Sequence, residues 1–143
     1  MIIRIATGVC ESLLAEARGA HPDECCGLVT GKPGLIEAVV PARNVSPHPA
    51  TSFEIDPGTL MRTQRSVRES QRQVVGHYHS HPNDSAEPSP RDAARATHNG
   101  QVWIILAAGT VTGWEVVNQR EADDERGDGC VHGRFLPIKL LPV

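Results

Sequence analysis

The sequence predicts one α+β domain in which helices flank a mixed β-sheet. Its 143 residues have the size of a single domain with one hydrophobic core. Segments with helical spacing of apolar residues and short strand-like segments follow one another in the order helix, strands, helix, strand, helix, strands. A strictly alternating parallel sheet would place a helix between every two strands, so this order favours the α+β class. We therefore expect residues 1–143 to form one domain.

The first predicted helix is capped by Thr7 and ends near Gly19. Its apolar residues fall on one side, at Val9, Leu13, Leu14 and Ala17. Two apolar segments then predict strands, CGLVTG at 26–31 and GLIEAVVPARNV at 34–45, and TSFEID at 51–56 predicts a shorter third one. These segments form the first half of the expected sheet.

The second predicted helix begins with Asp56 as N-cap and Pro57 in the first helical position, and it extends to about Gln73. It carries arginines at near-helical spacing, at positions 62, 65, 68 and 72. A charged helix face of this kind is usually solvated, and docking of an acidic partner is the alternative.

The second half of the chain supplies further predicted strands and a third helix. The strands are VVGHYHS at 74–80, QVWIILAA at 101–108, TVTGWEVV at 110–117 and RFLPIKL at 134–140, and the helix starts at Ser89 and Pro90. The acidic, turn-rich segment at 118–133 predicts a surface loop.

Composition argues against several classes of protein. The formal net charge of −3 disfavours a general nucleic-acid binder, which normally shows a basic surface. The chain has no apolar stretch long enough for a membrane helix, and its start lacks the features of a secretory signal, so we expect a cytoplasmic protein. The four cysteines form no C-x-x-C motif, and adjacent Cys25 and Cys26 cannot bridge without strain, which favours reduced thiols.

Three histidines alternate with other residues at positions 77, 79 and 81. Residues two apart on a strand point to one face, with Cα atoms roughly 6.5 to 7 Å apart, so two imidazoles can bind one metal ion. Spacing alone cannot choose between the pair His77 and His79 and the pair His79 and His81. A catalytic zinc takes three protein ligands and leaves a fourth position for water. The candidates for the third ligand are Asp84, Glu87 and Asp92.

The segment SPRD at 89–92 is typical of a helix start. Ser89 would cap the helix, Pro90 would occupy its first position and Asp92 its third, which explains these residues by structure alone. A role in metal binding is compatible with this role in helix capping. A carboxylate in a rigid first turn can also point at the metal, while Ser89 stays free to bond a developing oxyanion.

Glu24, in the segment PDECCG, completes a family motif, although alone it would be an ordinary surface glutamate. His79 and His81, then seven residues, then Ser89 and Asp92 reproduce the spacing of the JAMM motif. With Glu24 upstream, the sequence resembles the JAB1/MPN/Mov34 family of zinc metallopeptidases, of the small prokaryotic type. The segments FEIDP and VWIILAA also match, so the resemblance spans most of the chain.

The resemblance implies a fold and a set of roles. The fold is a curved mixed β-sheet flanked by helices. The implied zinc ligands are His79, His81 and Asp92. Glu24 would be the general base and then the acid, and Ser89 would help to bind the oxyanion. His77 stands where relatives often carry an aromatic or aliphatic residue, so it either orients a ligand or forms a wall of the substrate groove.

The resemblance also implies a reaction, the hydrolysis of an amide or isopeptide bond at the Gly-Gly tail of a ubiquitin-like or sulfur-carrier protein. Only a short loop follows His81, with no long segment to grip a polyubiquitin linkage, which favours the sulfur-carrier tail. A thin Gly-Gly segment could pair with an open strand edge beside the metal.

Other classes remain as alternatives. A non-catalytic MPN-fold interaction module is disfavoured because every ligand position is filled. A RadC-like DNA-associated protein shares the histidine, serine and aspartate spacing, but the acidic balance and the lack of an N-terminal extension disfavour it. A cysteine hydrolase could use Cys25 or Cys26 with His21, although cysteines that enter an apolar strand usually belong to the core.

Overall fold

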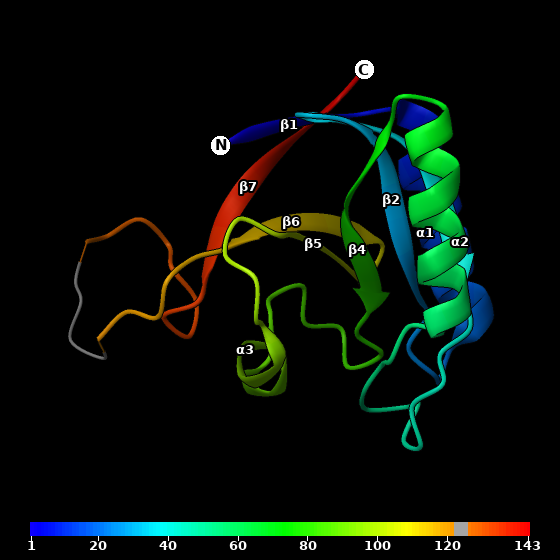
Figure 1. Ribbon diagram of the computed structural model, residues 1–143. Helices are drawn as coiled ribbons and strands as arrows, with labels where there is room; N and C mark the ends of the chain where they lie inside the picture. The colour runs from blue at the N-terminus through cyan, green and yellow to red at the C-terminus, as the bar shows by residue number, and fades with distance from the viewer. Residues whose placement is uncertain (122–125) are drawn as a thin grey trace.

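The computed structural model of this chain describes residues 1–121 and 126–143. Within these residues, the β-strands form one sheet that curves until it closes into a barrel (Figure 1). The strands are β1 (Ile2–Ile5), β2 (Cys26–Lys32), β3 (Leu35–Ala42), β4 (Gln73–Ser80), β5 (Val102–Ala107), β6 (Thr110–Val116) and β7 (Phe135–Pro142).

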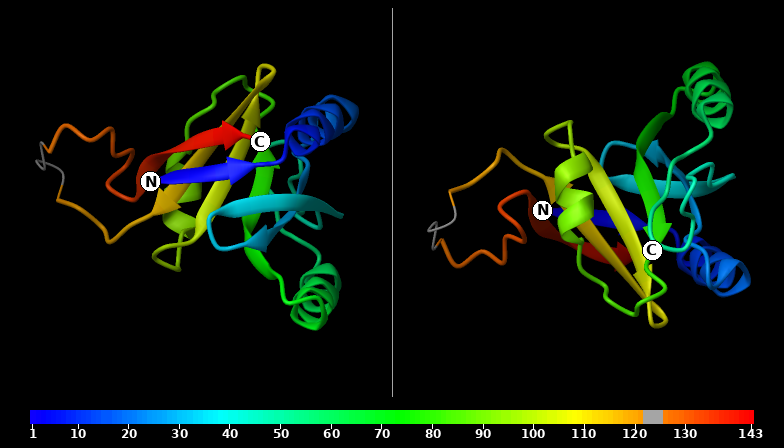
Figure 2. Two further views of the ribbon diagram at one scale, coloured as in Figure 1. Left: turned by 90° about the horizontal axis from the view of Figure 1, so that it is seen from above. Right: turned by 90° about the horizontal axis from the view of Figure 1, so that it is seen from below.

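The sheet is mixed, with the strand order β1-β3-β2-β4-β5-β6-β7. β4 is parallel to β5, β1 is parallel to both β3 and β7, and the other neighbours are antiparallel. β1 closes the barrel because Arg4 pairs with Leu35 on one side and Ile2 pairs with Lys139 on the other. Figure 2 shows β1 and β7 side by side. The predicted α+β class with a curved mixed sheet is confirmed.

β1 was not predicted from the sequence, in which we expected no strand before the first helix. Ile3 and Ile5 are buried in this strand, while Ile2 and Arg4 are exposed. Four residues are too few to show a clear alternation in the sequence. The strand is defined by partners more than thirty residues away, which no local pattern reveals.

The helices are α1 (Thr7–Ala20), α2 (Pro57–Glu69) and α3 (Pro90–Arg95). α1 packs against β3, β5 and β6, and α2 packs against β4 and β2. α3 lies below the sheet in Figure 1, away from α1 and α2. α2 ends before its predicted limit because Gln73 is already the first residue of β4.

The helix starts were predicted in part. Asp56 caps α2 as expected, and its side chain accepts the N–H of Thr59 at 3.3 Å. The prediction for α1 was wrong in its first residue: Ala6 occupies the N-cap position, and the Thr7 hydroxyl donates to the carbonyl oxygen of Val143 at 3.0 Å. The pairing of β1 with β7 brings the end of the chain to this position.

Two apolar clusters pack on opposite faces of the sheet. The cluster that includes α1 contains Ile3, Ile5, Val9, Leu13, Val29, Ile36, Tyr78, Val102, Ile104 and Leu106, among others. The cluster that includes α3 contains Cys26, Phe53, Trp103, Ile105, Trp114, Val116 and Phe135, with Ala93 and Ala96 packed against it. Successive residues of β4 therefore face different clusters: Tyr78 belongs to the first, and His79 contacts Phe53 and Trp103 of the second.

Three other expectations can be compared with the structure. Residues 51–56 do not form the predicted strand, and only an isolated bridge joins Asn44 to Ile55. The described part of the predicted loop 118–133 lies outside helices and strands, while residues 122–125 of this loop lie outside the described residues. Within the described ranges, no helix combines the length and the apolar character needed to cross a membrane.

The strands around the candidate site leave no open edge among the described residues. β2 pairs with β3 and β4, β4 pairs with β2 and β5, and β5 pairs with β4 and β6. The expectation of an open strand edge beside the metal was therefore wrong. It failed because β2, β4 and β5 lie in the interior of the sheet, a strand order that local sequence patterns do not reveal.

Candidate metal centre

β4 positions the first part of the site. His77 and His79 lie on the same face of the sheet, because alternate residues of a strand point to the same side. His81 follows the end of β4, and its N–H donates to the carbonyl oxygen of Leu106 at 2.9 Å, which extends the strand pairing by one residue. His79 and His81 are both buried, and their Nε2 atoms lie 2.9 Å apart.

α3 brings Asp92 to the same point. Ser89 caps this helix: its hydroxyl oxygen accepts the N–H of Asp92 at 3.0 Å, and Asp92 Oδ2 accepts the N–H of Ser89 at 2.9 Å. Asp92 Oδ2 also lies 3.0 Å from His81 Nε2 and 3.3 Å from His79 Nε2. One carboxylate therefore completes the predicted capping box and faces both imidazoles.

The distances among these three groups fit a tetrahedral zinc site. Bonds of about 2.0 to 2.1 Å at tetrahedral angles would separate two ligand atoms by about 3.3 Å. The observed separations are 2.9, 3.0 and 3.3 Å. Among the described residues, His79, His81 and Asp92 form the group of histidine, cysteine and acidic side chains that could hold a metal ion. Two imidazoles and a carboxylate are a donor set that suits zinc.

The three groups also shift one another's pKa. Burial acts to raise the pKa of Asp92, but hydrogen bonds from His79 and His81 outweigh it and hold this pKa well below its usual range. Burial acts to lower the pKa of His81, but Asp92 raises it overall. Burial lowers the pKa of His79. Asp92 is therefore an anion, and His79 is a neutral imidazole with a lone pair to donate.

Two different forces orient the imidazoles. Nδ1 of His81 lies 2.8 Å from the carbonyl oxygen of Ser85. Nδ1 of His79 is buried without a hydrogen-bond partner. The ring of His79 instead stacks on Phe53, with centroids 4.2 Å apart, and meets Trp103 edge-on at 5.7 Å. Aromatic packing thus fixes one predicted ligand, and a hydrogen bond fixes the other.

Glu24 faces the same space. It is 7% exposed, and with His81, Ser89 and Asp92 it lines a cavity of about 150 Å³, which we name the catalytic cavity for its proposed role. Desolvation raises the pKa of Glu24 to about 7, and the nearby His81 offsets this only in part. A carboxyl group with such a pKa can both accept and donate a proton near neutral pH. The structure thus brings all five residues of the motif to one place.

Asn44 binds the backbone of Glu24, a role that was not predicted from the sequence. Its Nδ2 donates to the carbonyl oxygens of Glu24 at 2.9 Å and Ser52 at 3.1 Å. Its Oδ1 accepts the N–H groups of Ser46 at 3.0 Å and Glu54 at 3.1 Å. The loop after β3 is thereby tied to Glu24. All four partners of the Asn44 side chain are backbone groups, which exist at every position of a chain. The sequence therefore gave no signal of this role.

Two arginines of α3 bind the same loop and were also missed. Arg91 donates to the carbonyl oxygen of Thr51 at 3.0 Å, and Arg95 donates to that of Phe53 at 2.5 Å. The guanidinium carbon of Arg95 also lies 5.2 Å from the centroid of the Phe53 ring. The segment FEIDP, noted for its resemblance to the family, was the available signal for Phe53.

The remaining candidate ligands lie apart from the group. The ring of His77 packs against Trp103, with centroids 4.5 Å apart, and its buried Nδ1 has no hydrogen-bond partner. Burial lowers the pKa of His77 to about 3. Asp84 and Glu87 are exposed. The structure thus brings together one of the two histidine pairs that spacing allowed, with one of the three candidate carboxylates.

The adjacent cysteines are buried in the two apolar clusters, Cys25 in one and Cys26 in the other. Desolvation raises the pKa of Cys25 to about 11 and that of Cys26 to about 12. Both are therefore neutral thiols at pH 7, and a thiol is a poor nucleophile. This argues against the cysteine hydrolase alternative.

Comparison with known proteins identifies the family. The family model described as prokaryotic homologs of the JAB domain matches residues 7–121. The chain belongs to this family, so the resemblance read from the motif is confirmed.

Three curated relatives are similar to this chain over two thirds of its length or more. Desampylase of Haloferax volcanii is 31% identical over 73% of this chain and 80% of its own length. A probable TtuB-protein conjugate cleaving protease of Thermus thermophilus is 32% identical over 67% of this chain and 64% of its own length. CysO-cysteine peptidase of Mycobacterium tuberculosis is 29% identical over 74% of this chain and 73% of its own length.

Solved structures share the fold. A protein from Desulfitobacterium hafniense superposes with a TM-score of 0.78 and 24% identity, over 99% of this chain and 94% of that one. A JAB1/MPN domain protein from Archaeoglobus fulgidus gives a TM-score of 0.58 and 21% identity, over 97% and 99% of the two chains. A structure described as a metalloprotease-like zinc site in the proteasome and signalosome gives a TM-score of 0.54 and 19% identity, over 99% of each chain.

Proposed function

We propose that this chain is a zinc-dependent metallopeptidase that hydrolyses an amide or isopeptide bond at the C-terminal tail of a ubiquitin-like or sulfur-carrier protein. The observation that carries the proposal is the convergence of two buried imidazoles and a carboxylate beside the buried Glu24. The relatives support it, because their names describe a desampylase, a protease for conjugates and a peptidase for a carrier bearing cysteine.

The proposed zinc ligands are His79 Nε2, His81 Nε2 and one oxygen of Asp92. When bound, zinc would make water more acidic and polarise the carbonyl of the scissile bond. The chain's own residues prepare the site for it. The hydrogen bond from the Ser89 N–H fixes the carboxylate of Asp92, and the packing and hydrogen bond described above fix the two rings.

Glu24 is the proposed base and then the acid. Its carboxylate takes a proton from the attacking water and returns it to the nitrogen of the leaving amine. The pKa of about 7 suits both steps, since a group that exchanges protons near the working pH is an efficient catalyst. The attack by water is direct, so the proposed reaction has no covalent enzyme intermediate.

Ser89 is the proposed donor to the oxyanion of the tetrahedral intermediate. Its hydroxyl oxygen accepts the N–H of Asp92, so its own O–H remains to donate toward the catalytic cavity. A donor of this kind contributes on the order of 3 kcal/mol to the transition state in other hydrolases. The same residue therefore caps α3 and supplies a catalytic hydrogen bond.

The substrate proposed for this cavity is a Gly-Gly tail. A cavity of about 150 Å³ admits a segment without side chains more readily than one with them. Since the sheet offers no open edge at the site among the described strands, the tail must bind here through the loop residues and not by strand addition. We favour a sulfur carrier over a polyubiquitin chain, because only a short turn follows His81.

Other parts of the proposal concern the chain as a whole. We propose that residues 1–143 act as one domain in the cytoplasm, without nucleic acid. A non-catalytic interaction module of the same fold would have no need of a buried, raised-pKa glutamate beside three convergent ligands.

A direct assay tests the function. The zinc-loaded protein is incubated with a ubiquitin-like carrier that ends in Gly-Gly followed by a cysteine or a peptide, and the products are weighed by mass spectrometry. We expect release of a carrier that ends in Gly-Gly, and we expect a chelator to abolish this cleavage. An intact carrier after incubation with fully loaded protein would refute the proposal.

A further inference from the structure

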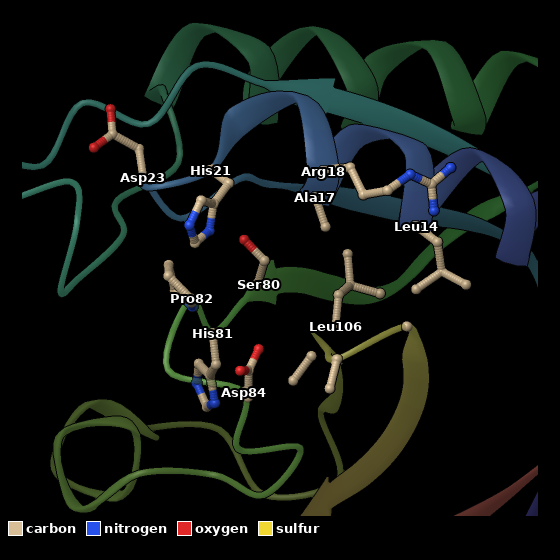
Figure 3. Close-up of a pocket in the computed structure, with 13 residues that line it drawn as sticks. Leu14, Ala17, Arg18, His21, Asp23, Ser80, His81, Pro82, Asp84 and Leu106 are labelled. Atoms are coloured by element: carbon tan, nitrogen blue, oxygen red, sulfur yellow. The ribbon is translucent and has the colours of Figure 1, made fainter.

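A second cavity lies beside the catalytic cavity, and we name it the α1 pocket. Its volume is about 350 Å³, which is within the range of pockets that bind small ligands. Figure 3 shows α1 above this pocket, the end of β4 behind it and the turn between β5 and β6 below it. Of the five motif residues, His81 lines this pocket and the other four do not.

The α1 pocket and the catalytic cavity adjoin. His81 and Pro82 line both of them. On the opposite wall, Asp23 lines the α1 pocket and its neighbour Glu24 lines the catalytic cavity. A substrate chain that runs between Asp23 and Glu24 on one side and His81 and Pro82 on the other therefore passes from one cavity into the other.

The residues at the floor of the α1 pocket differ in polarity from those at its rim. Leu106 and Ala107 are buried and Leu14 and Ala17 are half-buried, and they form an aliphatic floor. The charged lining residues Arg18, Asp23 and Asp84 and the histidine His21 are all exposed. Figure 3 shows the side chains of Leu14, Ala17 and Leu106 directed at one another across this space. The pocket thus offers a mainly aliphatic interior, in which the buried Ser80 and His81 are the polar groups, with a charged entrance.

We propose that the α1 pocket binds the aliphatic side chain of the residue that supplies the leaving amine. This inference rests on the proposed function. In that reaction, the leaving nitrogen lies beside Glu24, from which it receives its proton. The chain that continues from this nitrogen then meets the wall formed by Asp23, which belongs to the α1 pocket. The Gly-Gly tail lies on the other side of the scissile bond and has no side chain to fill a space of this size.

The chemistry of the floor defines the class of leaving group. Leucine or methionine after the scissile bond would bury its side chain against Leu14, Ala17 and Leu106. An acidic residue would lose its hydration against this floor, since Arg18 lies at the exposed rim. Since one methylene in an apolar pocket changes kcat/KM by roughly 10- to 200-fold, we expect leucine to exceed glycine by at least about 10-fold.

The test compares carriers that end in Gly-Gly-Leu-Ser with carriers that end in Gly-Gly-Gly-Ser. Ala17→Trp fills the pocket, and Ala17→Leu fills it in part. Both should lower kcat/KM for the leucine substrate far more than kcat/KM for the glycine substrate, so that the ratio of the two falls. Ala15→Trp is the matched control, because Ala15 is exposed on the same helix, and it should keep the preference for leucine. Zinc content and the unfolding midpoint verify that each variant is folded.

Two results would overturn the inference while the proposed function stands: equal kcat/KM of the parent for both carriers, or an undiminished preference in folded Ala17→Trp. Failure of the zinc-loaded parent to cleave either carrier would overturn the proposed function, and this inference with it.

Discussion

The ring of Phe53 lies nearly parallel to the imidazole of His79, with centroids 4.2 Å apart and the two planes inclined by 16°. Nδ1 of this histidine is buried and has no hydrogen-bond partner, so the ring is not held by a hydrogen bond on the side opposite the Nε2 that faces His81 and Asp92. A metal-binding histidine normally donates this N–H to an acceptor that fixes its orientation. In the proposed zinc site, the stack with Phe53 would orient His79 instead.

Replacing Phe53 by leucine should therefore weaken zinc binding. The loss of groups that orient metal ligands costs roughly 10- to 100-fold in affinity, and we expect the lower part of that range because Trp103 still contacts His79. Competition with a chromophoric chelator measures the effect. Phe53→Tyr keeps the ring and should bind zinc as the parent does. Unchanged affinity in a folded Phe53→Leu variant would show that the stack has no orienting role.

The ligand set gives the second prediction. The purified protein should bind one zinc per chain, and His79→Ala, His81→Ala and Asp92→Asn should each lower the occupancy, because three ligands define the site. Asparagine is preferable to alanine at position 92, since it preserves an acceptor for the Ser89 N–H and thus the cap of α3. His77→Ala is the control and should retain zinc. Loss of zinc from His77→Ala with full retention in His81→Ala would reverse the choice of pair.

The features that the sequence predicted are those that depend on short spacings. The spacing of His79 and His81 and the Ser89 to Asp92 helix start are local patterns. In the structure, His79 lies on β4 and His81 directly follows its end, and Ser89 caps α3. Glu24 came only from the family resemblance, because its cavity is formed by residues distant in the sequence. The role of Asn44 was not predicted, since the Glu24 carbonyl that it binds lies twenty residues before it.

The thiols give the third prediction. Burial raises the pKa of Cys25 to about 11 and of Cys26 to about 12, so at pH 7 the reactive thiolate is scarce at both positions. Alkylation of these cysteines in the native protein should be slow and should become faster as the pH rises. At pH 7, iodoacetamide should leave peptidase activity intact while a chelator removes it, with labelled residues located by mass spectrometry. Inactivation that follows alkylation of Cys25 would revive the cysteine hydrolase alternative.

The arginines of α2 give the fourth prediction. Arg72 lies beyond the end of α2 and pairs with Glu37 at 2.7 Å. Arg62, Arg65 and Arg68 are exposed on the helix, with Arg62 at 4.0 Å from Asp56. If these three dock an acidic carrier, reversing their charge should raise KM for the carrier several-fold and flatten its salt dependence. The kcat for a short peptide should stay the same. Kinetics on the carrier that match the parent at every salt concentration would support the interpretation as a solvated face.

The last prediction isolates Glu24 as the proton-transfer group. Glu24→Gln keeps the shape of the side chain but cannot take a proton, so general base catalysis worth typically 10²- to 10⁴-fold is lost. The loss should appear in kcat with KM and zinc occupancy little changed, because the missing interaction belongs to the transition state. Asp23→Asn is the matched control: it is one residue away, exposed, and lines the neighbouring α1 pocket. If Glu24→Gln cleaves the carrier as fast as the parent, the base lies elsewhere, and the exposed loop carboxylates Asp84 and Glu87 become the candidates to replace next.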